Sequence, residues 1–346
     1  MIKEKIIFHK DFKFFSSNEF ENIGTKSDYI YDDLYINYKK LCSPKVLYKN
    51  SSFKINEKNI SIYCPATLEF KLPETEFNYF GEPFSILSTN PLQSEHKKIL
   101  TDLFHELKNK NSFTSFLLKS PIRSEDIKFK LNQEDTAIDS IHTESKINLK
   151  QTLNQILSSF SKGHKSSLKK DYPELVYELF DHINYKDNQI FEMMKLHQVV
   201  SKKKSRSTET WTAMERMILN KSGFLVRVKN KNKLISYAFF FHNKYNSYYF
   251  SSCTIRDNFK KYNNITHKII WKALEYLKKI KCSYLFLGVT KTINKSSKNW
   301  ISKLYDLTDE EALRFHEKEN MVHRFKASFG GEKNNFVVYK DIPKNF

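Results

Sequence analysis

One lysine lies in a setting that could give its charge a chemical use. Lys326 falls between Phe325 and Phe329, and Gly330 and Gly331 follow directly. An ammonium group held on an apolar wall can bind a phosphate, or it can stabilise the oxyanion that forms when an amine attacks an acyl carbon. The chain contains 51 lysines, so an ordinary surface position is the alternative. Both interpretations of Lys326 stay open.

A basic stretch near the middle of the chain is a second candidate. Residues Ser159–Glu174 read SFSKGHKSSLKKDYPE and include Lys162, His164, Lys165 and Lys169. Such a cluster could capture a negatively charged substrate, for example a phosphorylated or uronic one. The imidazole of His164 could also act as a general base. The alternative is a solvated run of charges on the surface.

A third group lies at the start of a predicted helix. Arginine is scarce, with 7 residues against 51 lysines, so Arg206 suggests a need for the planar guanidinium fork. Glu209 could accept a proton from a substrate, or it could be an ordinary first-turn glutamate favoured by the helix dipole. Trp211 could contact a substrate, or it could belong to the core.

Two further pairs could contribute to a site. Tyr248 and Tyr249 are neighbours on a predicted strand, and because strand side chains alternate they must face opposite sides of the sheet. Thr266 and His267 begin a predicted helix. They could hold a phosphate at the helix N-terminus, or they could simply cap the helix.

The sequence offers no pattern for a metal site. Its four cysteines have no metal-ligand spacing, and its 11 histidines form neither His-x-x-x-His nor His-Glu-x-x-His. We expect no metal, and we expect cysteines that are reduced and mostly buried. There is also no Walker loop and no Gly-x-Gly-x-x-Gly after a strand. This excludes P-loop NTPases and ordinary dinucleotide-binding enzymes.

The elements that would position these residues are clearest in the second half. Three strands are predicted over Phe224–Val228, Leu234–Phe241 and Tyr248–Ile255, joined by short polar turns. This order is typical of an antiparallel meander. An amphipathic helix over about Ile265–Lys279 follows. A strand at Tyr284–Leu287 comes next, and it can pair in parallel with an earlier strand.

The remaining elements complete an α+β fold with a mixed sheet and flanking helices. The predicted helices are about Ser94–Lys110 with Ser94 as N-cap, Leu149–Ser159, Gln189–Lys202, and Ser207–Asn220 with Ser207 as N-cap. The predicted strands are Ile60–Tyr63, Thr67–Leu72, Asp135–Ile141 and Phe336–Tyr339, with a turn at Asn78–Pro83.

Length and composition narrow the class of protein. At 346 residues the chain has room for about two domains. Hydrophobic residues make up 40% and aromatic residues 15%, which excludes wholesale disorder. The most apolar run, Leu234–Phe241, is too short to span a bilayer, and charges interrupt the first residues where a signal peptide would be apolar. We therefore expect a cytoplasmic protein.

The net charge of +19 is open to two explanations. The excess of lysine, asparagine, isoleucine and phenylalanine is typical of an AT-rich genome. A functional basic surface is the alternative, serving a phosphate-bearing substrate, a membrane face or tRNA. Because the charge comes from lysine rather than arginine, we predict no specific DNA binding near physiological salt.

The order of elements resembles the GNAT acyltransferase fold, and four stretches resemble its FemAB-like branch. The stretches, in order, are SKGHKSSLKK (Ser161–Lys170), SRSTETW (Ser205–Trp211), THKIIWKALEYLKKIKCSYLFLG (Thr266–Gly288) and FKASFGGE (Phe325–Glu332). The branch includes the peptidoglycan interpeptide-bridge aminoacyltransferases. The resemblance covers about residues 160–340. It implies two GNAT-like domains, a degenerate one over 1–150 and an acyltransferase domain over 151–346.

The resemblance also implies roles for the candidate residues. It places Lys326, Tyr249 and Glu209 as catalytic candidates. It places Lys162, His164, Lys165, Arg206 and Trp211 on the substrate, and Thr266 and His267 on the acyl donor. The donor could be an acyl-CoA such as acetyl-CoA, or an aminoacyl-tRNA. The loop before the long helix, RDNFKKYNNITH, lacks the Gly-rich motif of acetyl-CoA enzymes.

The function that follows from the resemblance is N-acyl transfer. An acetyl, other acyl or aminoacyl group would pass to an amine, such as that of a phosphorylated, lipid-linked or nucleotide-linked amino sugar used for the cell envelope. Possible contacts with tRNA and with a membrane surface accompany this interpretation. The alternative is a non-catalytic, basic nucleic-acid-binding protein, which would require lysines gathered on one face with exposed aromatics between them.

Overall fold

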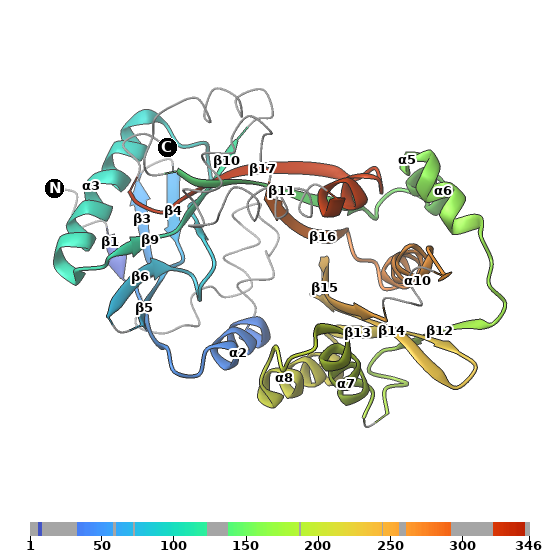
Figure 1. The fold of residues 1–346 in the computed structure, drawn as a ribbon. Helices are drawn as coiled ribbons and strands as arrows, with labels where there is room; N and C mark the ends of the chain where they lie inside the picture. Colours follow the sequence, from blue (N-terminus) through green and yellow to red (C-terminus); the bar gives the residue numbers. More distant parts are fainter. Residues whose placement is uncertain are drawn as a thin grey trace, which may run out of the picture. The chain divides into compact units, whose positions relative to one another are not determined.

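A computed structural model describes residues 6–8, 33–57, 60–71, 73–122, 138–186, 188–243, 245–255, 261–291 and 321–342 (Figure 1). The chain divides into two compact units. The first contains 1–143, 290–321 and 334–346, and the second contains 144–289 and 322–333. This division differs from the predicted single domain boundary near residue 150, because three strands of the chain have residues in both units.

The second unit carries most of the candidate residues. Its helices are α5 (Leu153–Ser159), α6 (Lys162–Lys169), α7 (Gln189–Ser201), α8 (Thr208–Leu219) and α10 (Ile265–Lys279), and residues 321–327 are also helical. Its strands are β12 (Leu175–Phe180), β13 (Gly223–Asn230), β14 (Lys233–His242) and β15 (Asn246–Thr254), together with parts of β11 (Ile138–Asn148), β16 (Tyr284–Lys291) and β17 (Glu332–Tyr339).

The predicted meander is confirmed. Strands β13, β14 and β15 pair antiparallel in sequence, and β16 pairs in parallel with β15. Strand β12, which was not predicted, adds to the outer edge antiparallel to β13. Within β12, Val176 is 50% exposed and Glu178 is charged, so this edge strand lacks the apolar alternation that marks the others.

Helices cover both faces of this sheet. Figure 1 shows α10 on one face of β13–β15 and the α7–α8 pair on the other. Residues of α10 pack with α5 and α6 into one buried cluster that includes Ile156, Phe160, Phe240 and Leu274. Phe239 is equally buried but lies outside this cluster, and its ring packs on Phe250. Because side chains alternate along each strand, the candidate residues on these strands are divided between the two faces of the sheet.

Local sequence explains where α5 and α6 begin. The Thr152 hydroxyl accepts from the Gln155 backbone at 3.2 Å, and the Gln155 side chain accepts from the Thr152 backbone at 2.8 Å. This capping box starts α5 at Leu153, four residues later than predicted. The Ser161 hydroxyl accepts from the His164 backbone at 3.3 Å and caps α6.

The first unit is also built of helices and sheets. Its helices are α2 (Asp33–Cys42) and α3 (Ser94–Asn111). Its strands are β1 (Ile6–Phe8), β2 (Leu47–Asn50), β3 (Phe53–Glu57), β4 (Ile60–Cys64), β5 (Thr67–Lys71), β6 (Glu74–Asn78), β7 (Phe84–Ser85), β8 (Leu87–Ser88), β9 (Ser115–Phe116) and β10 (Leu118–Ile122), with the other parts of β11, β16 and β17. Two four-stranded sheets have the orders β1-β3-β4-β8 and β2-β5-β6-β9.

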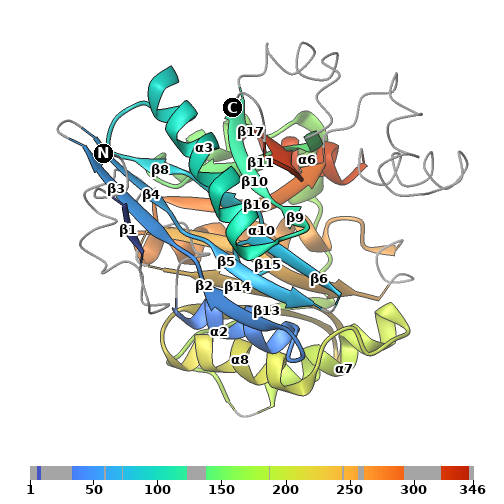
Figure 2. The same cartoon turned by 90° about the vertical axis from the view of Figure 1, so that its left-hand side faces the viewer.

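An aromatic core holds the first unit together. Figure 2 shows α3 lying over its strands, and the Phe104 ring of α3 lies 5.1 Å from Phe116 and 5.7 Å from Phe84. The predicted helix is confirmed, but its N-cap is Gln93 rather than Ser94, because Gln93 forms a capping box with His96. The predicted turn is also confirmed, with φ values of 50° and 77° at Phe80 and Gly81.

Two general features concern membranes and cysteines. No helix among the residues that the structure describes is both long and apolar enough to cross a bilayer.

Cys64, Cys253 and Cys282 are free and buried, as expected, whereas Cys42 is free and exposed.

Candidate functional site

Two neighbouring strands of the second unit separate in the middle of the sheet. Strands β15 and β16 pair in parallel over three residue pairs only, from Asn246 opposite Tyr284 to Tyr248 opposite Phe286. Immediately beyond this point the β14–β15 register shifts, because Phe240 faces Tyr249 but Phe239 faces Ser251. The resulting bulge bends β15 and frees backbone groups beside the gap. The prediction that these two strands splay side by side is confirmed.

Lys326 lies on the β16 side of this gap. Its ammonium donates a hydrogen bond to the Val289 carbonyl at 3.0 Å. Gly288 has a φ of +86°, and a Cβ there would lie 3.3 Å from the Lys326 Nζ. Glycine therefore permits both the bend of β16 and the approach of the ammonium. The expected strand or extended turn at Lys326 is wrong, because residues 321–327 are helical.

Arg206 lies on the β15 side of the gap. Its Nη1 donates to the Ser251 hydroxyl at 3.1 Å, and its guanidinium lies 5.3 Å from the centre of the Trp211 ring. Trp211 is only 1% exposed, so it packs in the core and supports Arg206 rather than offering a surface to a substrate. The guanidinium is thus held by an aromatic face and a strand hydroxyl.

Four rings join α6, α10 and the 321–327 helix. The His164 and His267 ring centres are 4.3 Å apart, and His164 lies 4.5 Å from Phe329 and 5.3 Å from Phe325. The Nε2 of His164 lies 3.1 Å from the Phe325 carbonyl, so it must carry the proton and donate it. His164 thereby fixes the helix that carries Lys326, and its imidazole does not face open solvent.

The enclosed histidine pair predicts a pH dependence of stability. Burial, and then the neighbouring His164, lower the pKa of His267 to about 4, and burial lowers the pKa of His164 as well. In the unfolded chain a histidine has a pKa of about 6.5, so the unfolded state binds this proton more readily. The stability contributed by neutral His267 is therefore complete above about pH 6.5, and it is lost as the pH falls towards 4.

His267→Phe tests this directly. Between pH 7 and pH 4 the wild type should lose about 2–3 kcal/mol more unfolding free energy than His267→Phe, measured by urea titration at each pH. His242, whose pKa burial also lowers to about 4, is present in both proteins and cancels in the comparison. Equal losses in the two proteins would show that His267 does not titrate in this range.

The remaining catalytic and donor candidates differ in their surroundings. Tyr249 is half-buried on the α10 face and donates to the Ser252 hydroxyl at 2.7 Å. Burial raises its pKa to about 12, so it is a neutral phenol at pH 7. Tyr248 faces the other side and stacks on Phe286 at 4.8 Å. Glu209 is exposed on α8, where its own backbone N–H lowers the pKa of its carboxyl. Thr266 is half-buried at the start of α10.

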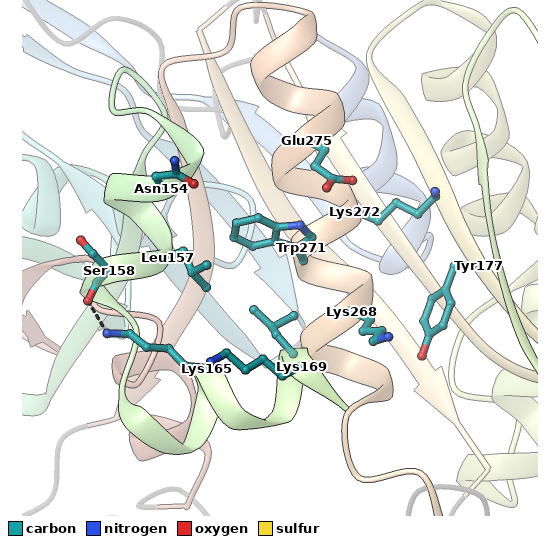
Figure 3. A pocket seen from close by; sticks show the side chains of 11 residues that line it. Asn154, Leu157, Ser158, Lys165, Lys169, Tyr177, Lys268, Trp271, Lys272 and Glu275 are labelled. Atoms are coloured by element: carbon teal, nitrogen blue, oxygen red, sulfur yellow. Dashed lines mark hydrogen bonds between the residues drawn. The ribbon is translucent and has the colours of Figure 1, made fainter. Parts of the chain in front are cut away.

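A cavity of about 730 Å³ opens elsewhere in the same unit, between α5, α6, α10 and the Tyr177 ring of β12 (Figure 3). Of the predicted basic residues, Lys165 and Lys169 line it, whereas the exposed Lys162 does not. Four lining residues on α10 were not predicted as candidates. They are Lys268, Trp271, Lys272 and Glu275. Their i, i+3, i+4, i+7 spacing marks one helix face, and a tryptophan on that otherwise charged face was the available signal.

Metal ligands are not assembled in the part of the chain that the structure describes. No three histidine, cysteine, aspartate or glutamate side chains come together there as a metal ion would require.

The chain is similar to known proteins in structure but not in sequence. No model of a known protein family matches the chain, and no curated protein does. Among solved structures, FemX is 13% identical, with 93% of this chain and 96% of that chain covered, at a TM-score of 0.56. A tandem GNAT protein from the clavulanic acid biosynthesis pathway is 9% identical, with 97% and 98% covered, at 0.47. A GCN5-related N-acetyltransferase from Sphaerobacter thermophilus is 7% identical, with 100% and 98% covered, at 0.47.

The similarity to FemX defines the class of fold. Its TM-score is above 0.5 and it extends over nearly the whole of both chains, so the chain has the fold of FemX. The predicted resemblance and the α+β fold class are confirmed. At 13% identity the similarity shows the fold alone, and the chemistry must come from the site.

Proposed function

We propose that this protein is an N-acyltransferase that passes an acyl or aminoacyl group to an amine. The observation that carries the proposal is the gap between β15 and β16, which has a held cation on each side. Arg206 is fixed to Ser251 of β15, and Lys326 is fixed to the Val289 carbonyl of β16. A bulge in β15 adjoins the same gap, as bulges often do at active sites.

This arrangement suits attack of an amine on an acyl carbon. The carbonyl oxygen of the donor gains negative charge as the new C–N bond forms, and backbone N–H groups of the bulge and the Lys326 ammonium can stabilise it. The bond from the acyl carbon to the donor's ester oxygen or thioester sulfur then breaks, and this leaving group takes the proton that the amine gives up. The strand gap would hold donor and acceptor in line, which lowers the entropy cost of their meeting. Tyr249, protonated at pH 7, can donate a hydrogen bond but cannot serve as the base.

The charges support a phosphate-bearing acceptor. Arg206 carries a rigid guanidinium fork beside the gap. It is therefore a better anchor than Lys326 for a phosphate of a nucleotide- or lipid-linked amino sugar. Asn264 and His267 at the start of α10 are 0% and 8% exposed, and the preceding loop lacks glycine. These features favour an aminoacyl-tRNA ester over an acyl-CoA, whose pyrophosphate would need open N–H groups there.

Transfer from defined donors tests the proposal. Purified full-length protein would be incubated with aminoacyl-tRNA or with acetyl-CoA, together with nucleotide-linked amino sugars and their peptide-bearing forms. Mass spectrometry would then follow the acceptor. The expected result is a mass gain of one aminoacyl residue, dependent on the ester donor. Turnover with acetyl-CoA alone would keep N-acyl transfer and reverse the choice of donor. Absence of transfer from both donors to every amine would contradict the proposal.

A further inference from the structure

The cavity beside α10 is separate from the strand gap. Its lining residues on α10 lie on the opposite side of the helix from Ile269, Ile270 and Leu274, which are buried against the sheet. Residues of α5, α6 and β12 supply the other walls. Its volume of about 730 Å³ falls in the range of small-molecule sites. Nothing in the acyl-transfer proposal uses this space.

Lysines from two helices face this cavity. Lys165 and Lys169 come from α6, and Lys268 and Lys272 come from α10. Lys165 donates to the Ser158 carbonyl at 2.7 Å, and Lys268 pairs with the exposed Asp171 at 2.7 Å. Lys169 and Lys272 make no hydrogen bond or ion pair with any described residue. Two fixed and two unpaired cations around one cavity favour an anionic ligand.

An indole lies between the charged groups. Figure 3 shows Trp271 reaching from α10 towards Leu157 of α5, and Leu168 of α6 also lines the cavity. Its ring packs edge-to-face on the buried Phe160 at 6.1 Å, which fixes its position. A large, rigid aromatic surface on an otherwise charged helix face suits a flat ligand group that can stack on it.

The two ends of the cavity differ in charge. Figure 3 shows Asn154, Glu275 and Lys272 at the end away from Lys165 and Lys169, with Trp271 between the two ends and Lys268 towards Lys169. Glu275 forms no ion pair with any described residue. A carboxylate at one end accepts hydrogen bonds, and lysines at the other end bind anions. The cavity is therefore complementary to a ligand with an amino group at one end and a phosphate at the other.

We propose that this cavity binds a nucleotide whose base carries an exocyclic amino group, as in AMP. The base stacks on Trp271, its amino group donates to Glu275, and the phosphate lies between Lys169 and Lys268. An anionic lipid would use the lysines and the apolar wall, but it would leave the Glu275 carboxylate without a partner. Hence the polar end favours the nucleotide.

Calorimetric titration of the full-length protein with AMP tests the proposal without any turnover. We expect saturable binding of one AMP per chain. IMP, which lacks the amino group, should bind at least about fivefold more weakly, because a hydrogen bond to a charged acceptor is lost. Adenosine should bind at least about tenfold more weakly, because it lacks the phosphate. Since binding is measured alone, its failure leaves the acyl-transfer proposal standing, and the reverse also holds.

Variants assign the binding to the cavity. Lys169→Gln combined with Lys268→Gln should weaken AMP binding by about tenfold or more, and Trp271→Leu by about fivefold or more. Glu275→Ala should abolish the preference for AMP over IMP. Lys279→Gln, on the exposed side of α10 and outside the cavity, is the matched control and should bind AMP as the wild type does.

Several results would overturn the proposal. The proposal is wrong if AMP shows no saturable binding, or if the double lysine variant binds AMP as tightly as the wild type does. It is also wrong if inorganic phosphate binds as tightly as AMP. A further contradicting result is that AMP does not bind, whereas monomeric short-chain phosphatidylglycerol does and Trp271→Leu weakens the binding of this lipid. That result would identify a lipid site. The double lysine variant changes one exposed and one half-buried side chain outside the core, so it keeps the test valid even if Trp271→Leu fails to fold.

Discussion

Lys326→Met is expected to lower kcat/KM for acyl transfer by at least about tenfold, and by about 10²–10³-fold if the ammonium is a full oxyanion donor. The substitution keeps the length of the side chain and removes its charge from the edge of the strand gap. Its structural cost should be small, because the lost hydrogen bond to the half-exposed Val289 carbonyl contributes about 1 kcal/mol. The variant should therefore lose much of its activity but little of its stability.

The comparison variants make this result specific. Lys326→Arg should restore activity only in part, because the guanidinium fork is larger than the ammonium, which already lies close to the Gly288 backbone. Lys195→Met, which removes an exposed charge from α7, controls for the change in net charge and should retain wild-type kcat/KM. Activity would be measured with the donor and acceptor that the transfer assay identifies, and unfolding would be followed for each variant. Wild-type kcat/KM in Lys326→Met would remove Lys326 from the mechanism.

Much of the second unit could be predicted from sequence because its elements carry strong local signals. The three meander strands are apolar and end at polar turns, and α10 has a wide apolar stripe. Their predicted bounds agree with the structure to within two residues, apart from the later end of β16. Strand β12 was missed because it lies at the sheet edge with an exposed valine. The long β11 was predicted only in part because polar residues alternate along it.

The candidate site was harder to predict, because it depends on contacts between distant segments. Arg206 reaches Ser251, and His164 reaches the Phe325 carbonyl across 161 residues. No local pattern encodes either contact. Sequence could indicate that Arg206 and Lys326 are unusual, but it could not show that one flanks β15 and the other β16. The helix at Lys326 was missed because its flanking glycines and aromatic residues suggest a turn or strand.

The glycine pair after Lys326 explains why FKASFGGE needs its last two small residues. A Cβ at Gly330 would lie 2.0 Å from the Ser159 carbonyl oxygen, and one at Gly331 would lie 2.2 Å from the Lys146 carbonyl oxygen. Both contacts are with backbone, which cannot move aside as a flexible side chain can. Gly330 also has a φ of +65°, which costs an alanine about 1–2 kcal/mol. The pair therefore lets the chain pass closely between α5 and β11.

Gly331→Ala is expected to lower the free energy of unfolding by about 3 kcal/mol or more, since its methyl group would overlap the backbone of Lys146. Gly330→Ala should lower it at least as much, because strain adds to the overlap. Gly163→Ala is the matched control, because Gly163 lies within α6 and a Cβ there meets nothing within 4 Å. It should raise stability by about 0.5–1 kcal/mol, as alanine favours helix more than glycine does. Urea unfolding at pH 7 measures all three. A Gly331→Ala protein as stable as the wild type would mean that β17 does not approach β11 this closely, and the placement of Lys326, which the same segment carries, would have to be revised with it.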